Sequence, residues 1–361
     1  MLPLQNVAVF LAGLLASVCL HAQEERGDDE RRITTPADIV SLIERSATTY
    51  QVHVMPADSV DRIALDILFP RVYPRIAFPV LLEHDGEPEV TEYPFDSVEA
   101  VLFMEAEERF AASEFDHAYV LYQDLLKRYP GCYVAVGNIG DCYYRQRDFA
   151  AALRYFDSAI GMNPIDPQFY FYRGDALRKM GRMDEAVESY IDALVYLPHY
   201  PIMIMGLNAI ADSTGIEIRD GLFAPKGFAR RDGDGIEIGV ANDAMSAGWL
   251  MYAMTKAAWL GEPEHRMQAG VASPGWSTRE ESEALSMLVM SYLANKQEDT
   301  EVSDPQSEML FRLTMNRQLL PFILYEIGAR IDPHIMGRVP EEVRNGVREY
   351  VRRYVVVRND R

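Results

Sequence analysis

Residues able to carry out catalysis or to bind phosphate or zinc occur in this sequence, but not in the spacing that such chemistry needs. The chain has no Gly-x-x-x-x-Gly-Lys-Ser/Thr loop to cradle a phosphate and no His-Glu-x-x-His pair of zinc ligands. In GVASPG the first glycine stands three residues before Ser273, whereas the nucleophile elbow Gly-x-Ser-x-Gly needs it two residues before. The sequence therefore gives no support to these classes of enzyme.

A calcium loop and a catalytic histidine are two further chemical hypotheses. The segment RRDGDGIEIG offers Asp232 and Asp234 as oxygen ligands, but Ile236 stands where a calcium loop needs another, so a turn between strands is the better interpretation. His265, in GEPEHRM, stands beside acidic residues and could act as a general base. The histidines are scattered and unpaired, which favours a surface histidine. We expect no catalytic residue, no metal and no cofactor.

Three aromatic residues, Trp249, Tyr252 and Trp259, are spaced to share one face of a helix. Packing in the core explains this stripe most simply, and a platform for a sugar or a peptide is the alternative. The two cysteines after the N-terminal segment, Cys132 and Cys142, are ten residues apart on one expected helix, about 15 Å along its axis. A disulfide needs α-carbons within about 7 Å, so we expect free, buried thiols.

The bulk composition is that of a folded protein long enough for two or three domains. The chain has 361 residues, of which 48% are hydrophobic and 11% aromatic. Acids outnumber bases by 55 to 35, a formal net charge of −20, which argues against nucleic acid or an anionic membrane surface as the main partner. The run from Arg338 reverses this balance, and Arg344, Arg348 and Arg352 line one helix face. We expect this face to dock onto the acidic body of the same molecule, with an anionic partner as the alternative.

The first residues are typical of a secretory signal peptide. An apolar run from Val7 to Leu20 is too short to span a bilayer comfortably, and LHA precedes a possible cleavage site before Gln23. No Lys or Arg precedes the run, so retention as an anchor and lipid attachment at Cys19 stay open as rivals. We expect an exported protein, periplasmic or extracellular, with residues 1–22 as the signal, 23–32 as a charged linker and no membrane span after cleavage.

Helical and extended segments follow in a defined order. Residues 33–97 combine a helix at PADIVSLIERS, a strand at YQVHVM and two extended segments around Asp85-Gly86, which predicts a small α/β region. Residues 98–213 are strongly helical. Residues 214–361 begin with a β-hairpin at 216–240 and continue as helices, one starting at Ser277, one capped by Asp304 and kinked or broken near Pro321.

One helix pattern recurs every 34 residues and ends each time in a proline, at Pro130, Pro164 and Pro198. Paired helices at this period indicate a stacked helical array. Counting each proline as position 32, small or aromatic residues recur at four positions: Ala106, Gly140 and Gly174 at position 8; Ala118, Ala152 and Ala186 at 20; Tyr122, Phe156 and Tyr190 at 24; Leu125, Ala159 and Ala193 at 27. These three stretches, about residues 99–198, resemble the tetratricopeptide repeat (TPR), and PIMIMGLNAIADSTG resembles its capping helix.

The resemblance implies a curved stack whose first helices line a concave groove at positions 2, 5, 6, 9, 12 and 13. In this chain the groove would present Phe103, Glu107, Phe110, Asn138, Asp141, Tyr144, Arg145, Gln168, Phe171, Tyr172, Asp175, Arg178 and Lys179. Aromatic rings and fixed charges of both signs suit an extended or helical polypeptide. Packing within the molecule, with a capping helix or the C-terminal domain in the groove, is the alternative.

The basic clamp by which some TPR domains hold acidic C-terminal tails is not expected here. Of its five positions only Asn138 matches, since the others hold Phe103, Glu107, Gln168 and Tyr172. We predict a mainly α fold: a TPR solenoid with a small α/β N-terminal region and a C-terminal helical domain preceded by a β-hairpin. The expected function is an exported, non-enzymatic scaffold that binds a polypeptide partner. An enzyme with its site in the C-terminal domain and a self-associating structural protein are the rivals.

Overall fold

The computed structural model describes residues 34–69, 76–242, 247–273, 275–297 and 304–358. The predicted signal peptide, Cys19 and the charged linker lie outside these ranges. Two compact units are present, and each combines segments far apart in the sequence. The first joins the described residues before 73 to 223–323, and the second joins 76–222 to the residues from 324 onward. The predicted succession of regions 33–97, 98–213 and 214–361 therefore differs from the compact units of the fold.

The first unit is built on a three-stranded sheet of order β1-β6-β5, with β1 at Tyr50–Met55, β5 at Gly227–Asp232 and β6 at Gly235–Ala241. Strand β1 runs parallel to β6, with Tyr50 opposite Ile236, and β5 and β6 form the predicted hairpin. Its helices are α2 (Pro36–Arg45), α3 (Ala57–Leu68), α12 (Ala247–Gly261), α13 (Pro263–Gln268), α14 (Thr278–Gln297), α15 (Pro305–Met315) and α16 (Leu319–Phe322). Helices α3 and α12 both pack against β5 and β6.

The aromatic stripe of α12 lies in the core of this first unit. Trp249, Tyr252 and Trp259 are at most 3% exposed, which confirms packing and rules out a ligand platform at these side chains. Their polar atoms donate to buried or half-buried carboxylates, such as the Trp249 indole N–H to Asp304 Oδ2 at 2.7 Å and the Tyr252 hydroxyl to Glu281 Oε1 at 2.7 Å. Asp304 also caps α15, as predicted, so one carboxylate joins a helix end to the core.

The kink or break predicted near Pro321 is a break, and it lies at residues 316–318. Helix α15 ends at Met315, and Arg317 has a positive φ of 58°, the left-handed conformation that ends many helices. Pro321 then falls within the first turn of the short helix α16, where its missing N–H costs little. Pro321 therefore does not cause the break, because the first turn of a helix tolerates a proline.

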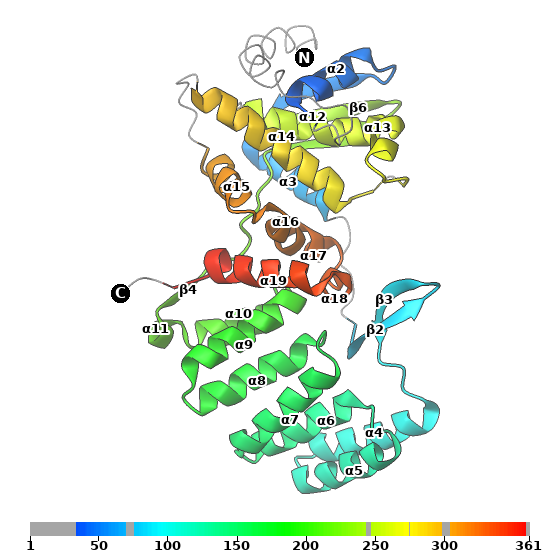
Figure 1. The fold of residues 1–361 in the computed structure, drawn as a ribbon, viewed down its shortest axis with the longest axis vertical. Coiled ribbons are helices and arrows are strands. Elements are labelled where there is room, and N and C mark those ends of the chain that lie inside the picture. Colours follow the sequence, from blue (N-terminus) through cyan, green and yellow to red (C-terminus); the bar gives the residue numbers. More distant parts are fainter. Residues whose placement is uncertain (1–33, 70–75, 243–246, 274, 298–303, 359–361) are drawn as a thin grey trace. The chain divides into compact units, whose positions relative to one another are not determined.

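The second unit contains the helical stack and the elements attached to it (Figure 1). Three helix pairs follow one another: α4 (Ser97–Ala111) with α5 (Phe115–Arg128), α6 (Tyr133–Arg145) with α7 (Phe149–Met162), and α8 (Pro167–Lys179) with α9 (Met183–Tyr196). Helices α10 (Pro201–Asn208) and α11 (Ala211–Thr214) follow the third pair. The hairpin β2 (Pro79–His84) and β3 (Glu87–Glu92) precedes the stack and turns at Asp85-Gly86, as predicted.

The repeated residues of the sequence form the interior of the stack. All of those at positions 8, 20, 24 and 27 are buried. A β-carbon placed on Gly140 would lie 2.7 Å from the ring of Phe156, and one on Gly174 would lie 2.7 Å from the ring of Tyr190. The small residue at position 8 is therefore required by the aromatic residue at position 24 of the same repeat, which confirms the physical basis of the repeat pattern.

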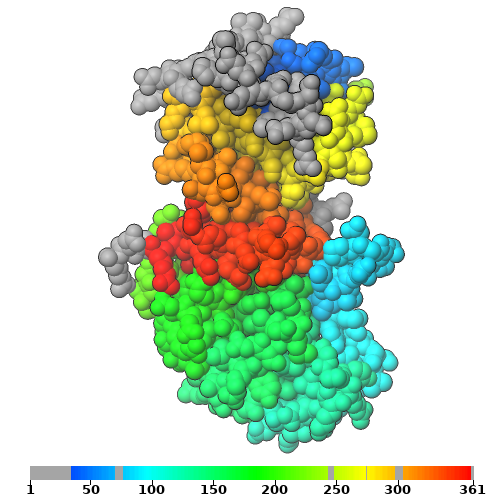
Figure 2. Space-filling model, in the orientation of Figure 1, coloured from blue at the N-terminus to red at the C-terminus, as the bar shows by residue number. Residues whose placement is uncertain are grey.

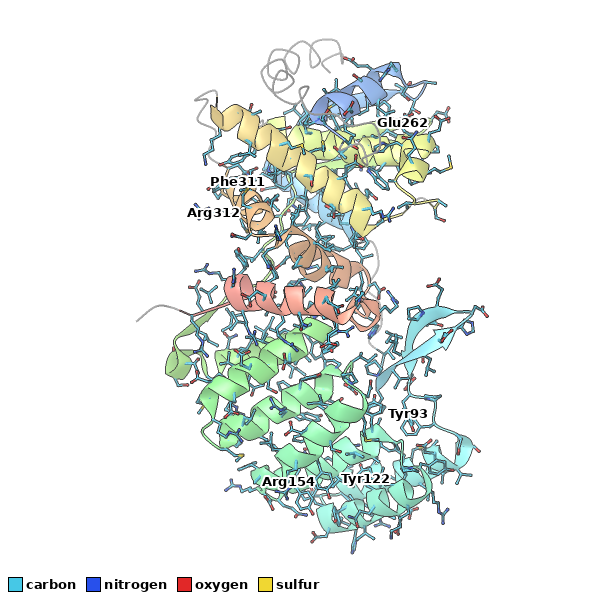
Figure 3. All side chains as sticks on the ribbon, viewed as in Figure 1. Tyr93, Tyr122, Arg154, Glu262, Phe311 and Arg312 are labelled. Carbon is cyan, nitrogen blue, oxygen red and sulfur yellow. The ribbon has the colours of Figure 1, made fainter. Side chains whose placement is uncertain are left out.

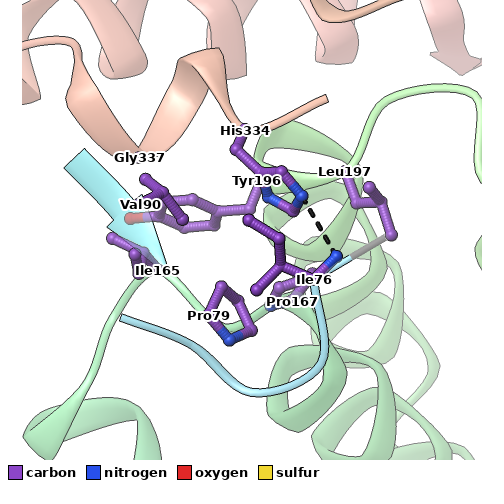
Figure 4. Close-up of a pocket in the computed structure, with 9 residues that line it drawn as sticks. All are labelled: Ile76, Pro79, Val90, Ile165, Pro167, Tyr196, Leu197, His334 and Gly337. Atoms are coloured by element: carbon purple, nitrogen blue, oxygen red, sulfur yellow. Dashed lines mark hydrogen bonds between the residues drawn. The ribbon is translucent and has the colours of Figure 1, made fainter. Parts of the chain in front are cut away.

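The β2–β3 hairpin is attached to the stack at its first strand. The carbonyl of Pro79 accepts hydrogen bonds from Asn163 Nδ2 at 2.8 Å and from the Tyr133 hydroxyl at 3.3 Å. A cavity of about 10 Å³ remains beside this junction, lined by Ile76, Pro79, Val90, Ile165, Pro167, Tyr196, Leu197, His334 and Gly337 (Figure 4). It has the room of about one water molecule, so the junction is structural.

The C-terminal residues return to the stack through η1 (Ile323–Gly328), α17 (Ala329–Ile331), α18 (Ile335–Arg338), α19 (Glu341–Tyr350), η2 (Val351–Val355) and β7 (Val356–Arg358), and β7 pairs with β4 (Ile216–Ile218). Helix α19 packs along α9 (Figures 1 and 2). Arg348 Nε lies 2.6 Å from Asp192 Oδ1, Arg352 pairs with Glu188, and Arg358 Nη2 lies 2.9 Å from an oxygen of Asp184. The basic face therefore docks onto acids of the same molecule, as expected, except that Arg344 donates to the carbonyls of 336 and 339.

Three further properties bear on function. Cys132 and Cys142 are free and buried, as expected, and burial raises the pKa of both thiols to about 12. Among the helices that the structure describes, none is long and apolar enough to cross a membrane. No group of three or more His, Cys, Asp or Glu side chains in the described ranges is arranged to hold a metal ion.

Candidate functional site

The predicted groove residues lie on the three inner helices of the stack, α4, α6 and α8. Local sequence explains two of their starts. Asp96 caps α4 by accepting from the backbone N–H groups of residues 98 and 99, and Asp166 caps α8, which begins with Pro167. Helix α6 begins at Tyr133 without a side-chain cap, and the burial of its apolar face stabilises it instead. The groove positions are thus fixed by rigid helices.

The first-repeat end of the groove is covered by residues that precede the stack. Phe103 is only 7% exposed, because the rings of Phe95 and Phe78 pack against it, with ring centroids 4.8 Å and 5.8 Å from the centroid of its own ring. Phe95 belongs to the segment between β3 and α4, marked by Tyr93 in Figure 3, and Phe78 stands directly before β2. Phe103 is therefore a packing residue, as the intramolecular alternative expected, although the cover comes from the N-terminal side.

Glu107 and Asn138 form a closed hydrogen-bond network with Tyr122, a residue marked in Figure 3. The Tyr122 hydroxyl donates to Glu107 Oε1, and Asn138 Nδ2 donates to the same oxygen at 2.7 Å. Burial and the neighbouring Glu107 carboxylate raise the pKa of Tyr122, so its hydroxyl remains a donor at physiological pH. These two predicted groove residues hold α4, α5 and α6 together.

A hollow of about 200 Å³ lies between α6 and α8. It is lined by five side chains: Asp141, Tyr144, Arg145, Tyr172 and Asp175. All five belong to the thirteen predicted groove residues. This volume is about twenty times that of the cavity beside β2, which has room for about one water molecule. The sequence pattern thus brings two tyrosines, two acids and one base around one open volume.

The two acids of this hollow differ in their surroundings. Asp175 Oδ1 accepts hydrogen bonds from the Tyr190 hydroxyl at 2.7 Å and from Arg178 Nη2 at 3.0 Å. Asp141 has no hydrogen bond or ion pair within the part of the chain that the structure describes. The pKa of Asp141 is raised to about 6. Burial is the largest cause, the Arg145 guanidinium opposes it, and the carboxylates of Glu107 and Asp175 add to it.

Arg145 and the groove residues outside the hollow have contacts of their own. The Arg145 guanidinium carbon lies 5.6 Å from the centroid of the Phe110 ring and 6.0 Å from that of Phe115. The Phe171 ring packs 5.7 Å from that of Tyr190. Gln168 and Phe171 are half-buried, and Lys179 is exposed at the end of α8. Arg178 is held by its ion pair with Asp175.

Phe78 and Phe95 are the site residues that sequence reasoning missed. They cover the first repeat, yet the repeat pattern begins after them and assigns them no position. A signal existed for Phe95 alone, because EYPF stands next to the first helix of the array, an end that needs a cover. Phe78 comes before the β2–β3 hairpin, which returns the chain so that the Tyr93 N–H donates to the Phe78 carbonyl.

His265, the candidate for catalysis in the C-terminal region, lies in a half-buried contact of the first unit. Its Nε2 is 3.1 Å from Glu283 Oε2, and the Trp259 indole N–H donates to the same oxygen at 2.5 Å. The rings of His265 and Trp259 also meet edge to face, with centroids 5.7 Å apart and planes at 82°. In the same unit, Glu262 (Figure 3) accepts from Tyr50, which ties α13 to the sheet.

Comparison with known proteins identifies the repeats. The tetratricopeptide repeat family matches residues 103–160 and 139–198. Together with the observed helix pairs, this shows that the stack consists of tetratricopeptide repeats. The TPR repeat-containing thioredoxin TTL4 of Arabidopsis thaliana is 35% identical over 65 residues, which is 18% of this chain and 10% of that protein. The chain thus matches only a small part of this relative.

The chain is also similar to parts of solved structures, among them a TPR domain and a secretion chaperone. The first TPR domain of human RPAP3 is 23% identical, with a TM-score of 0.31, covering 32% of this chain and 91% of that one. The type III secretion chaperone SycD of Yersinia enterocolitica, solved in complex with a peptide of the translocator YopD, is 17% identical. Its TM-score is 0.31, covering 33% of this chain and 95% of that one. Peptide binding in that structure is a property of SycD.

Proposed function

We propose that this protein is a non-enzymatic scaffold that binds a segment of another polypeptide in the groove of its TPR stack. One observation carries the proposal: five predicted groove residues, from two consecutive inner helices, line one hollow of about 200 Å³. Tyrosine rings beside charged groups suit a peptide, because rings offer large contact area at low conformational cost and charges set the register.

Binding is expected at the second and third repeats. The first repeat is covered by Phe78 and Phe95, so its Phe103 is not available to a ligand. The α9 face of the third repeat is occupied by α19. The hollow on α6 and α8 carries neither cover within the described residues, which leaves it as the surface for a partner.

The test is site-specific crosslinking in the cells that produce the protein. A photoreactive benzoylphenylalanine replaces Tyr172 in the tagged full chain, and crosslinked partners are identified by mass spectrometry. We expect a discrete partner whose yield falls at least about tenfold with Tyr144→Ala, the loss given by an interface residue worth about 1.4 kcal/mol.

Tyr155→Ala is the matched control for this experiment, because Tyr155 is also half-buried but lies on the outer helix α7 of the same repeat. Crosslinks that persist with Tyr144→Ala, or that Tyr155→Ala reduces equally, would refute a specific ligand in the hollow.

Action outside the cytoplasm is the second part of the proposal. It is supported by the short apolar run of residues 7–20 and the small residue at the proposed cleavage position. N-terminal sequencing of the protein from its native cells should give Gln23 as the first residue. An intact Met1 would contradict cleavage, and a lipid on Cys19 would support the anchored alternative.

A further inference from the structure

The three carboxylates of the groove divide into two that are satisfied and one that is not. Glu107 accepts from Tyr122 and Asn138. Asp175 accepts from Arg178 and Tyr190. Asp141, which lies on α6 between the helices that carry the other two, accepts no hydrogen bond from the described residues. A carboxylate partly removed from water without a partner is costly, so its surroundings favour the arrival of a donor.

The base nearest to Asp141 is engaged elsewhere. The Arg145 guanidinium lies over the rings of Phe110 and Phe115, and no nitrogen of Arg145 forms an ion pair with Asp141 in the part of the chain described. Arg178 is bound to Asp175. The charged groups around the Asp141 carboxylate are therefore Glu107 from α4, Arg145 from α6, and Asp175 with Arg178 from α8.

The walls of the hollow favour one kind of donor. Tyr144 and Tyr172 contribute aromatic rings on α6 and α8. Ring faces attract ammonium and guanidinium groups and pack against the methylene stems of long side chains. The charge of the whole chain, −20, also attracts cationic peptides from a distance.

We infer that the hollow between Tyr144 and Tyr172 receives a lysine or arginine side chain of the bound polypeptide, with Asp141 as its counter-charge. The inference rests on the proposed function, because it assigns a specificity to the same groove. It makes the chemistry of this TPR stack opposite to that of a basic clamp, since the groove selects a cation. The pKa of about 6 leaves Asp141 mostly ionised at pH 7, and a bound cation would lower that pKa.

The experiment selects ligands from a random peptide library displayed on phage, with the purified full chain as bait. We expect the wild type to enrich peptides with Lys or Arg at one fixed position, and Tyr144→Ala to lose these peptides. An enriched peptide is then synthesised with its basic residue and with norleucine in its place. The wild type should bind the basic peptide roughly 10- to 100-fold more tightly, the range of a charge-assisted hydrogen bond.

Two variants make the result specific. Asp141→Asn should reduce the preference for the basic peptide to less than about threefold, well below the range of a charge-assisted hydrogen bond. Asp157→Asn, the same change at an exposed carboxylate of the outer helix α7 that pairs with Arg173, should leave the preference unchanged. Because the amide of Asp141→Asn carries no charge, its burial does not unfold the repeat, and circular dichroism of both variants checks this.

The outcomes separate the two proposals. Groove-dependent peptides without a basic residue, or a basic preference that survives Asp141→Asn, would overturn the cation inference and leave the peptide-binding function standing. If Tyr144→Ala changes no enrichment at all, the proposed function fails and the inference fails with it.

Discussion

Acidic side chains on two faces of the same TPR stack differ in what neutralises them. On α9, Asp184, Glu188 and Asp192 stand four residues apart, and each pairs with an arginine of the C-terminal segment. In the groove, Asp141 lies beside the carboxylates of Glu107 and Asp175, and no arginine within the described residues forms an ion pair with it.

The difference shows how the molecule uses its two faces. The α9 face is complete, because the chain supplies its own partners in α19, η2 and β7. The groove face keeps an unsatisfied charge in a half-buried position, which a fold selected for stability alone would remove. Departures of this kind are typical of binding sites.

The largest expected effect comes from breaking the α9 face at its apolar centre. Val347 of α19 is fully buried, so Val347→Asp places a carboxylate in an apolar contact and should cost about 4 kcal/mol or more. We expect α19 to detach and its amide protons to exchange within the fast phase of a hydrogen-exchange experiment read by mass spectrometry. Asn345→Asp adds the same charge at an exposed position of α19 and is the control. Protected amides over 341–350 in Val347→Asp would contradict the docking.

The next effect comes from removing one charge of the α9 face. Arg348 and Asp192 are 31% and 21% exposed, and burial raises the pKa of Asp192 while Arg348 lowers it. Arg348→Ala leaves that carboxylate without its partner, so we expect a loss of about 1–3 kcal/mol in the opening free energy of α19. Adding Asp192→Asn should recover at least half of the loss. A double variant as unstable as Arg348→Ala would mean that the guanidinium acts by packing alone.

Removing a charge from the groove face should stabilise the protein, whereas removing one from the α9 face destabilises it. The pKa of Asp141 is raised from 3.8 to about 6, so the folded protein binds this proton more tightly than the unfolded chain does. Stability from this group is complete below pH 4 and is lost as the pH rises through 6. Asp141→Asn should therefore stabilise the stack by about 1–3 kcal/mol at pH 8, and by roughly half of that at pH 5.

Hydrogen exchange over α6 and α8, at several pH values, measures this difference between wild type and Asp141→Asn. Tryptophan fluorescence would not report on it, because all three tryptophans, Trp249, Trp259 and Trp276, lie in the first unit. Destabilisation by Asp141→Asn at pH 8 would show that the wild-type carboxylate has a structural donor, and would remove the basis for an unsatisfied charge in the groove.

The sequence predicted the stack well because its signals are local and repeated. Gly174 and Tyr190 are sixteen residues apart in one repeat, and a fixed period places each such pair in contact. The two hairpin turns, the cap of α15 and the groove helices follow from the same short-range patterns. The position of the hollow also follows, since five residues assigned by repeat position line it.

Pairings between distant segments were beyond the sequence pattern. Nothing in YQVHVM specifies that β1 runs parallel to β6. The paired residues Tyr50 of β1 and Ile236 of β6 are 186 positions apart in the sequence. The same holds for β4 with β7 and for Phe78 over Phe103. Alternating or amphipathic patterns predict that one face of an element is buried, but they do not identify the element that packs on it. For this reason the sequence could indicate that the arginines of α19 dock on an acidic surface, but not that α9 carries it.

The smallest expected effect tests whether the stability contributed by an ion pair of the α9 face depends on how deeply the pair is buried. Arg352 and Glu188 are 42% and 41% exposed, against 31% and 21% for Arg348 and Asp192. Solvent screens the exposed pair, so Arg352→Ala should change the opening free energy of α19 by less than about 0.5 kcal/mol. The change should vanish in 1 M salt, where the Debye length is about 3 Å, whereas the loss in Arg348→Ala should largely remain. Equal losses for the two variants at low salt would show that the ion pairs of the α9 face contribute equally, whatever their burial. The energy of Asp141 in the groove would then depend on all the charges of the stack, and its lack of an ion-pair partner would not by itself mark a binding site.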